Sequence, residues 1–429
     1  MDIKLDLGRL FVLSSLQMEV ISMLCQFSFT NFRSYRDETT FDFQAYNLSE
    51  FNDSLIVTDK ASDVLPVSVI YGPNGGGKTN LLAALSAAIS LVVSPVYELE
   101  KTSSTFIIQQ KTELMPYMFD DTSKEEPTEF QLFFRVNNNE YRYYIAVLNS
   151  VIVSESLYRK TIGGKKPALL FNRENGSIEV GPTISSKSIN TSVNPKMPYV
   201  SFLAINYSIP VISEVMGWFE SCIIRSYANP VAESQILLTE NEDSKKRFIN
   251  MMNDMGIEIS GYRYDKENEQ FLLQRIIGDK EYDIPFINES DGTRKLFAAL
   301  PVIIMALREG RLIIIDELDA KLHPKLLRYV IKLFTNPEIN RNGAQLLFTS
   351  HDLTTMKNTV FRRDEIWFAA LNDENSSEIF SLYDIRREDN EHVNNTAAYD
   401  KQYLEGRYGA DPYLRNMLSW EALDEQKAT

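Results

Sequence analysis

The stretch Tyr71 to Asn80, YGPNGGGKTN, decides how this chain folds. It is too rich in glycine for a stable helix and too small to build a core. Residues 72–79 match the pattern G-x-x-x-x-G-K-[ST], in which glycines let backbone N–H groups surround phosphates without a Cβ in the way. A β-branched run, LPVSVIYG, ends at Gly72, and leucines and alanines then repeat as in a helix from Lys78 to about residue 93. A phosphate loop needs this position between a buried strand and a helix.

Each residue type in the loop has an expected role. Lys78 would neutralise charge between the β- and γ-phosphates, and the positive end of its helix would point at the same groups. The hydroxyl of Thr79 would bind Mg²⁺. A glycine-rich surface turn is the alternative interpretation, and the flanking strand and helix argue against it. The nucleotide-binding residues expected here are Asn74, Gly75, Gly76, Gly77, Lys78 and Thr79.

Two carboxylates end a later apolar strand. In RLIIIDELDAKLHP, which runs from Arg311 to Pro324, four apolar residues precede Asp316 and Glu317. Ligands of open α/β sheets bind at this carboxyl end of the strands. We expect Asp316 to hold Mg²⁺ and Glu317 to polarise the attacking water as general base. Solvated acids at a strand end are the alternative, which the upstream phosphate loop disfavours.

Composition limits the partners and the compartment. The 429 residues carry a formal net charge of −15, which argues against general attraction to nucleic acid or anionic membranes but is compatible with a local basic patch. Two distant cysteines, Cys25 and Cys222, indicate a reducing cytoplasm. The apolar run near the N-terminus is too short and too polar to span a bilayer. We expect residues 1–22 to be a peripheral extension, or translation to start at Met23.

The remaining pattern predicts an α/β chain. Residues 23–43 alternate as in a first strand pair, and residues 128–182 contain three strand-like runs separated by turns. The runs RLIIIDE, AQLLFTS and EIWFAAL are short and apolar, as in parallel strands buried on both faces. A helix is expected within ESQILLTENEDSKKRFINMMNDM, and no sustained heptad pattern indicates a long coiled-coil arm.

Three further segments carry a resemblance. INESDGTRKLF contains Ser290-x-Gly292 about 25 residues before Asp316, LLFTSHD ends in Ser350, His351 and Asp352, and SFTNFRSYRD lies in the first strand pair. Together with the phosphate loop, this set resembles the ABC-type ATPase heads of the SMC/RecF/OLD group. It is most similar to the OLD-like AAA ATPases of bacterial abortive-infection, toxin–antitoxin and other anti-phage systems, as is the segment YLEGRYGADPYL (residues 403–414).

The resemblance implies a fold and an arrangement of the site. It implies a P-loop NTPase of ABC-head type, with a mixed sheet, an antiparallel β subdomain and a mainly helical insert. The discontinuous head would comprise residues 23–182 and 285–425, with the loop at 72–79, the signature at 289–294 and the acidic strand at 312–317. Residues 183–284 would form a helical or mixed lid or partner-binding insert.

The resemblance also assigns roles to single residues. Arg33 in NFRS would help to bind nucleotide, and His351 would be the switch histidine that senses the γ-phosphate. Ser290 and Gly292 would meet the γ-phosphate of ATP held by a second subunit, so that two copies sandwich ATP and Mg²⁺ head to tail.

Some features depart from the group. The signature ESDGT differs from the transporter LSGGQ, which disfavours membrane transport, and His323 stands where transporter heads carry an aspartate. The glutamine of the Q-loop stays open among Gln109, Gln110 and Gln131. Pro301 falls within the predicted signature helix and should kink it.

The functional expectation is an Mg²⁺-dependent ATPase that serves as sensor and scaffold in anti-phage defence. Fewer than 80 residues follow SHD, without an acidic cluster or histidine arrangement typical of a nuclease, so a separate effector, a nuclease encoded nearby, is expected. A phage protein or DNA would be the trigger. The alternative is a RecF-like DNA-repair ATPase that binds DNA directly. A purely structural nucleotide binder is disfavoured by Glu317.

Overall fold

The computed structural model describes residues 22–100, 114–184, 188–230, 233, 242–386 and 391–410. Residues 1–21 of the expected N-terminal extension lie outside the described residues. So do Gln109, Gln110 and the last four residues of the segment 403–414.

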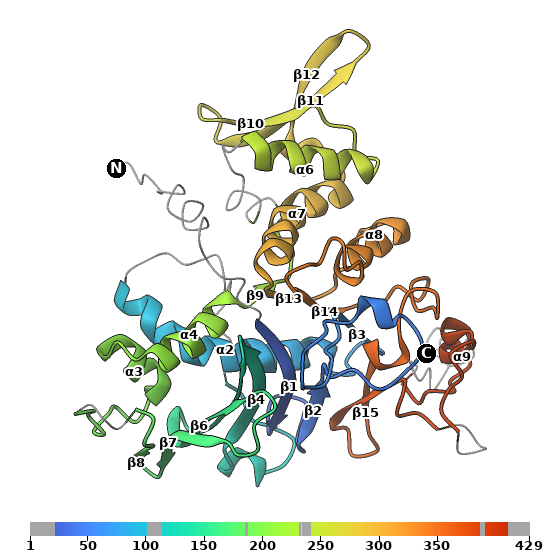
Figure 1. Ribbon diagram of the computed structural model, residues 1–429. Coiled ribbons are helices and arrows are strands. Elements are labelled where there is room, and N and C mark those ends of the chain that lie inside the picture. Colours follow the sequence, from blue (N-terminus) through green and yellow to red (C-terminus); the bar gives the residue numbers. More distant parts are fainter. Residues whose placement is uncertain are drawn as a thin grey trace, which may run out of the picture.

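A six-stranded sheet carries the phosphate loop, in the order β16-β15-β3-β14-β13-β9 (Figure 1). All neighbouring strands run parallel except β15 and β16, which are antiparallel. The three apolar runs predicted as parallel strands are therefore confirmed as β13, β14 and β15. The strands are β3 (Val67–Tyr71), β9 (Ile223–Arg225), β13 (Leu312–Ile315), β14 (Gln345–Thr349), β15 (Ile366–Leu371) and β16 (Ser377–Ser381).

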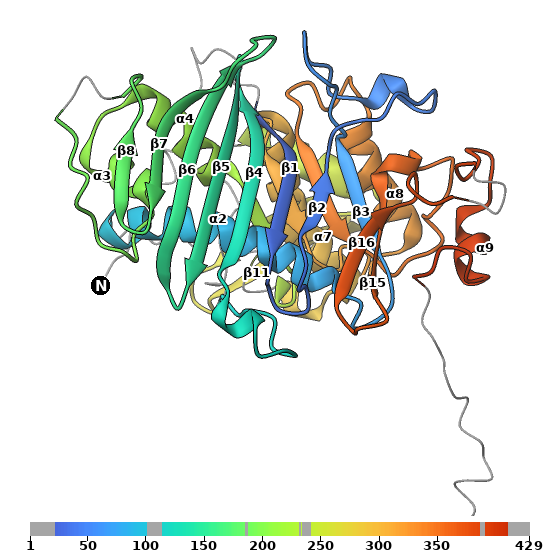
Figure 2. The same ribbon diagram turned by 90° about the horizontal axis from the view of Figure 1, so that it is seen from below.

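A second, antiparallel sheet has seven strands in the order β2-β1-β4-β5-β6-β7-β8 (Figure 2). The predicted first strand pair is present as β1 and β2, and the runs at 128–182 form β4 to β8. The strands are β1 (Ser22–Thr30), β2 (Thr39–Asp42), β4 (Thr128–Val136), β5 (Asn139–Leu148), β6 (Val151–Thr161), β7 (Ala168–Glu174) and β8 (Ser177–Val180).

Helix α2 (Lys78–Glu100) starts at the phosphate loop and packs in the core that both sheets share. It is long and apolar enough to cross a membrane, but 61% of its apolar window is buried inside the protein, as in a core helix. Helices α3 (Tyr199–Asn206) and α4 (Pro210–Ser221) pack against it. On α4, Trp218 stacks on Phe134 of β4 with 4.1 Å between ring centroids.

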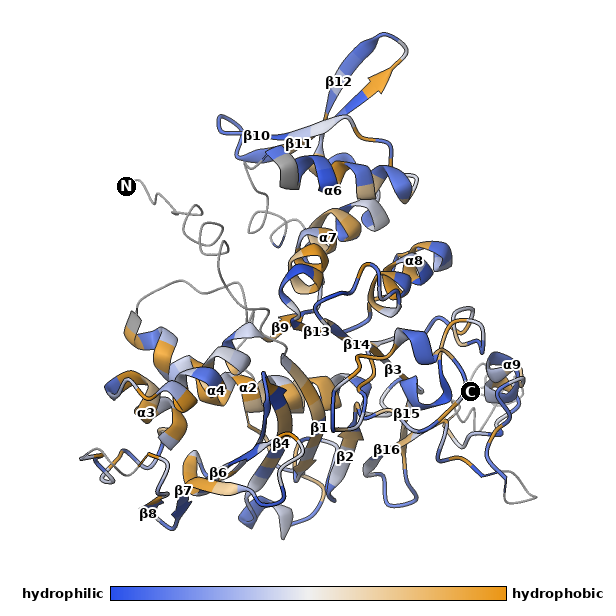
Figure 3. Ribbon diagram, in the orientation of Figure 1, coloured by the Kyte–Doolittle hydropathy of each residue, from blue (hydrophilic) through white to orange (hydrophobic). Residues whose placement is uncertain are grey.

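A smaller layer stands on helix α7 (Asp291–Glu309), at the top of Figure 1. Helix α6 (Glu242–Asp254) and the three-stranded sheet of β10 (Gly261–Asp265), β11 (Gln270–Ile277) and β12 (Lys280–Pro285) make it up. Phe297 of α7 contacts Phe248 and Tyr262, with ring centroids 5.1 and 5.6 Å apart. Figure 3 shows the largely hydrophobic α7 between this layer and the parallel sheet. Helix α7 runs on through Pro301.

Residues 183–284 thus divide among three places in the fold. Helices α3 and α4 pack in the core shared with the antiparallel sheet, β9 pairs with β13 in the parallel sheet, and α6 with β10–β12 covers α7. Beside its helices, this segment contributes four strands to the described structure. The remaining elements are α8 (Pro324–Thr335), α9 (Tyr399–Leu404) and the short 3₁₀ turns Asn52–Ser54, Ser123–Glu125, Phe286–Asn288 and Arg363–Glu365.

Gln345 ties the two sheets together at the start of β14. Its buried side chain accepts a hydrogen bond from the Leu24 backbone N–H at 2.7 Å and donates one to the Leu24 carbonyl at 3.0 Å. The N–H and the carbonyl of Leu24 in β1 thereby have hydrogen-bond partners away from water, as buried backbone groups require. This link fixes β14, and with it the residues that follow the strand, relative to the antiparallel sheet.

Candidate functional site

A pocket of about 240 Å³ lies over the phosphate loop. Its residues follow three neighbouring strands, β3, β14 and β13, whose carboxyl ends meet at one edge of the sheet. The structure therefore brings together the phosphate loop, Glu317 and His351. The pocket is lined by Asn74, Gly75, Gly77, Lys78, Thr79, Asn80, Glu317 and His351.

The loop conformation depends on its glycines. Gly77 has φ +107°, and a Cβ there would lie 2.5 Å from the hydroxyl oxygen of Ser377. Gly75 has φ +80°, and a Cβ there would meet nothing within 4 Å. The loop is thus tightly packed on the side of β16 and open at Gly75, which lines the pocket, as a phosphate cradle requires.

Lys78 is folded over its own loop. Its ammonium donates to the carbonyls of Gly72 at 2.9 Å and Pro73 at 3.0 Å, and the residue is only 7% exposed. Burial lowers the pKa of Lys78, while the carboxylates of Asp316 and Glu317 oppose that shift. A buried cation beside open backbone N–H groups is a favourable place for a phosphate.

Two hydroxyls hold the carboxylate of Asp316. Thr79 Oγ1 donates to Asp316 Oδ2 at 2.9 Å, and Thr349 Oγ1 donates to Asp316 Oδ1 at 2.6 Å. One hydroxyl and one carboxylate are hard oxygen donors of the kind that Mg²⁺ takes beside phosphate oxygens. Within the described residues, no group of three or more His, Cys, Asp or Glu side chains is arranged to hold a metal ion. The residues fit a magnesium–nucleotide complex.

Glu317 has an unusual backbone conformation. Its φ is +49°, in the left-handed region that non-glycine residues seldom occupy. Its N–H donates to Thr349 Oγ1 at 2.7 Å, and its carbonyl accepts from Lys295 Nζ at 2.6 Å. A strained residue persists only where its surroundings hold it, and such residues cluster at functional sites.

Lys295 and Thr349 were not predicted from the sequence. Lys295 is 4% exposed, donates also to the Ala320 carbonyl at 3.1 Å, and has its pKa lowered to about 8 by burial. The sequence places both residues inside segments that carry the family resemblance, Lys295 in INESDGTRKLF and Thr349 in LLFTSHD, and this was the only indication of a role at the site. A lysine in a helix and a threonine in a strand have no distinctive pattern, so sequence alone did not single them out.

His351 is exposed and borders the pocket. Its backbone N–H donates to Asp319 Oδ2 at 3.0 Å, and the other oxygen of Asp319 is buried without a hydrogen-bond partner among the described residues. Asp319 thus holds the backbone that carries His351.

Arg33 does not line the pocket. Its guanidinium reaches Asn80 Oδ1, which borders the pocket, at 3.4 Å, and lies 5.3 Å from the ring centroid of Phe32. Arg33 therefore contacts a residue that lines the pocket, Asn80, but does not reach the pocket itself.

Ser290 and Gly292 lie at the start of α7 and do not line the pocket either. Ser290 caps the helix, since its Oγ accepts from the Thr293 N–H at 3.1 Å. A Cβ on Gly292 would lie 2.8 Å from the Lys321 carbonyl, and Asp291 pairs with Lys321 at 2.9 Å. The signature thus packs against the loop that follows Glu317. In that loop His323 caps α8, with its Nδ1 accepting from Lys325 N–H.

The sequence matches the model of one protein family. The family described as "AAA domain, putative AbiEii toxin, Type IV TA system" matches residues 67–357, more than half of the chain. Among solved structures, the SMC head domain from Thermotoga maritima is 13% identical with a TM-score of 0.37, covering 84% of this chain and 98% of that one. The SMC head bound to the C-winged helix domain of ScpA is 12% identical with a TM-score of 0.43, covering 84% and 97%. No curated protein matches the sequence.

The pocket leads to a prediction about nucleotide binding. Lys78→Ala removes the cation from the phosphate loop, so we expect binding of a fluorescent ATP analogue to weaken at least about 100-fold, as loss of a charged hydrogen-bonding group would cause. A fluorescence titration measures the dissociation constant of the analogue. The matched control is Lys332→Ala on the exposed side of α8, which should bind as the wild type does. Normal affinity of Lys78→Ala would show that the nucleotide binds elsewhere.

Proposed function

We infer that this chain, which belongs to the AAA domain family described for AbiEii-type toxins of type IV toxin–antitoxin systems, is an Mg²⁺-dependent ATPase of an anti-phage defence system. The observation that carries the proposal is the convergence of Lys78, Glu317 and His351 on one pocket. In the P-loop motif, nucleotide binds at the glycine-rich loop between a strand and a helix, which are β3 and α2 in this chain. The free, buried cysteines Cys25 and Cys222 suit the reducing cytoplasm in which we place the protein.

Each side chain has a proposed role in hydrolysis. Lys78 and the N–H groups of the loop bind the β- and γ-phosphates, and Thr79 with Asp316 holds Mg²⁺, which supplies charge neutralisation when bound. Glu317 accepts the proton of the attacking water. His351, at the end of β14, senses the γ-phosphate. Positioning and charge stabilisation are what phosphoryl transfer needs, so these groups suffice.

Lys295 and Thr349 are proposed to position Glu317. They hold the carbonyl and the N–H of the same strained residue from two different elements, α7 and β14. Loss of either contact would let the Glu317 backbone relax toward a common conformation and carry the carboxylate away from the water.

A second copy of the chain is proposed to complete the site. Ser290 and Gly292 lie outside the pocket of their own subunit, at an exposed helix start. A head-to-tail dimer would place them on the γ-phosphate held by the other copy, so ATP would stabilise the dimer and hydrolysis would loosen it.

The ATPase is proposed to control a separate effector, a nuclease, in response to a phage protein or DNA. Its docking surface would be the tip of the β11–β12 hairpin, where Ile276, Ile277 and Tyr282 are 64%, 63% and 47% exposed. Residues 286–289 connect this hairpin to Ser290. A partner bound at the tip would therefore act on the signature. The alternative, a RecF-like ATPase that clamps DNA, would be favoured by salt-sensitive stimulation of hydrolysis by DNA.

The first test is the general base. Glu317→Gln should lower ATP hydrolysis at least about 100-fold, since general-base catalysis contributes that much or more, and should accumulate ATP-bound dimers. Light scattering after gel filtration measures the mass with and without ATP. The exposed Glu338→Gln is the control and should hydrolyse ATP normally. A Glu317→Gln protein that keeps full activity would overturn the assignment.

The second test concerns Lys295. Lys295→Met should lower kcat by between about 10-fold and 100-fold through displacement of Glu317, with KM for ATP unchanged within about twofold. Lys295→Arg keeps the charge and the donors and should recover part of kcat. Steady-state kinetics separates the two parameters. A rise in KM with normal kcat would contradict a positioning role.

The third test concerns the effector. The full chain, expressed with the products of the adjoining genes, should retain one of them through gel filtration. The double variant Ile276→Asp/Ile277→Asp should release it, while Ile339→Asp, at another exposed isoleucine, should not. If no neighbouring product stays bound to the wild type, the proposal of a held effector fails.

A further inference from the structure

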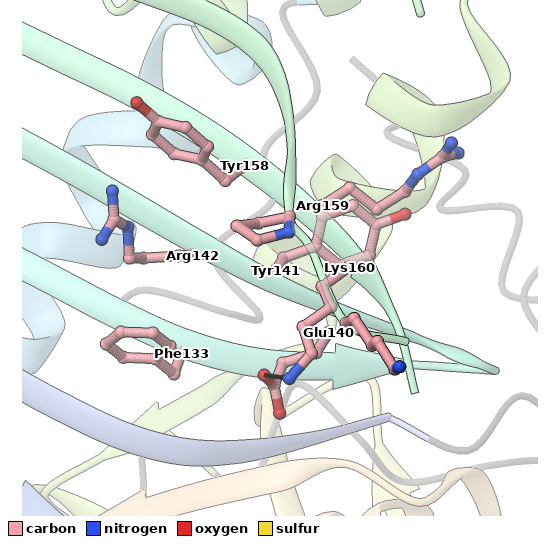
Figure 4. A pocket seen from close by; sticks show the side chains of 9 residues that line it. Phe133, Glu140, Tyr141, Arg142, Tyr158, Arg159 and Lys160 are labelled. Carbon is pink, nitrogen blue, oxygen red and sulfur yellow. Dashed lines mark ion pairs between the residues drawn. The ribbon is translucent and has the colours of Figure 1, made fainter. Parts of the chain in front are cut away.

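A second concave site of about 290 Å³ lies on the antiparallel sheet and shares no lining residue with the pocket over the phosphate loop (Figure 4). Three neighbouring strands and one connection build it. The residues that matter here are Phe133 of β4, Glu140 and Arg142 of β5, Tyr158 and Lys160 of β6, and Lys165 in the β6–β7 connection. We call this site the sheet groove.

A row of side chains crosses the sheet groove. Phe133 is the register partner of Arg142, and Arg142 is the register partner of Tyr158, so the three share one face of the sheet. The Arg142 guanidinium lies over the Tyr158 ring at 4.5 Å from its centroid. This stacking orients the guanidinium and leaves its edge N–H groups free to bind an anion.

The groove carries excess positive charge. Its one carboxylate, Glu140, is already paired with Arg135 at 3.3 Å and Lys160 at 3.9 Å. Arg142 and Lys165 have no ion pair within the described residues, and both are exposed. A cationic hollow is unexpected on a chain with a net charge of −15, and it favours an anionic ligand.

The chemistry of the lining distinguishes between anions. An oriented guanidinium and a nearby ammonium suit phosphate oxygens. The ring surfaces of Phe133 and Tyr158 beside them suit a nucleobase, which single-stranded nucleic acid proteins bind in the same way. The volume lies at the small end of ligand sites, enough for one unit and not for a duplex.

We propose that the sheet groove binds a nucleotide phosphate together with its base, presented either by a single-stranded nucleic acid or by a free nucleotide. The cations Arg142 and Lys165 bind the phosphate, and the rings of Phe133 and Tyr158 contact the base. The proposal goes beyond the ATPase function, because no residue of the ATP pocket takes part in it.

The experiment measures fluorescence anisotropy with the full chain in the Lys78→Ala background, in which binding at the phosphate loop is expected to be at least about 100-fold weaker. The probes are fluorescein-labelled 12-nucleotide single strands of DNA and RNA, labelled UMP, and a labelled decaglutamate peptide. Arg142→Glu and Lys165→Glu should each weaken binding of the strand or the nucleotide about tenfold or more, a typical loss for a phosphate contact. Tyr158→Leu keeps the charge and should also weaken it. The control Lys266→Glu makes the same charge change in the exposed β10–β11 turn and should alter affinity less than twofold.

The comparison of probes identifies the ligand, and a Lys78→Ala protein that binds none of the probes would overturn the proposal. Tight binding of the strands with weak binding of UMP supports a nucleic acid strand, and equal binding supports a free nucleotide. Decaglutamate bound as tightly as the strands would identify an acidic peptide site and overturn the proposal. The proposal would also be overturned if Arg142→Glu kept the affinity of the Lys78→Ala parent, or if Lys266→Glu lost as much affinity as Arg142→Glu. Each variant with the native lysine at position 78 should hydrolyse ATP as the wild type does, which shows that it folds.

Discussion

The carboxylate of Asp316 is the constraint on which the site depends. It accepts hydrogen bonds from Thr79 at the start of α2 and from Thr349 at the end of β14. These two contacts fix the phosphate loop, the acidic strand end and the strand before His351 relative to one another. A magnesium–nucleotide complex would meet ligands that these contacts already hold in place. Phosphoryl transfer needs preorganised groups of this kind.

The segment that follows Asp316 links the backbone of Glu317 to the start of α7. Glu317 occupies a left-handed conformation that Lys295 and Thr349 hold, and the carbonyl of Lys321 lies where a side chain on Gly292 would clash. The start of α7 and the loop that follows Asp316 are therefore packed as one unit. Under the proposed dimer, a change at Ser290, which meets ATP of the other copy, would reach Glu317 of its own copy through these contacts. Because the β11–β12 hairpin leads into the same helix start, a bound partner would act on the same unit.

Local patterns predicted the fold and most of the pocket. The phosphate loop and the apolar runs before Asp316 and His351 are continuous in sequence, and carboxyl ends of parallel strands meet at one edge of a sheet. Contacts between segments that are distant in the sequence were harder to predict. Strand β9 has only three residues, too few for a periodic pattern, and it joins the parallel sheet because β13 offers it an edge. Lys295 and the row across Phe133, Arg142 and Tyr158 depend on tertiary packing and strand register, which residue spacing does not reveal.

The proposed dimer requires that two copies of this chain complete one ATP site. The most direct measurement is a structure of the protein with Mg²⁺ and a non-hydrolysable ATP analogue. We expect a γ-phosphate bound by Lys78 of one copy and by Ser290 of a second copy, with Thr79 and Asp316 holding the metal ion. An analogue held by a single copy, with Ser290 of every subunit facing solvent, would contradict it.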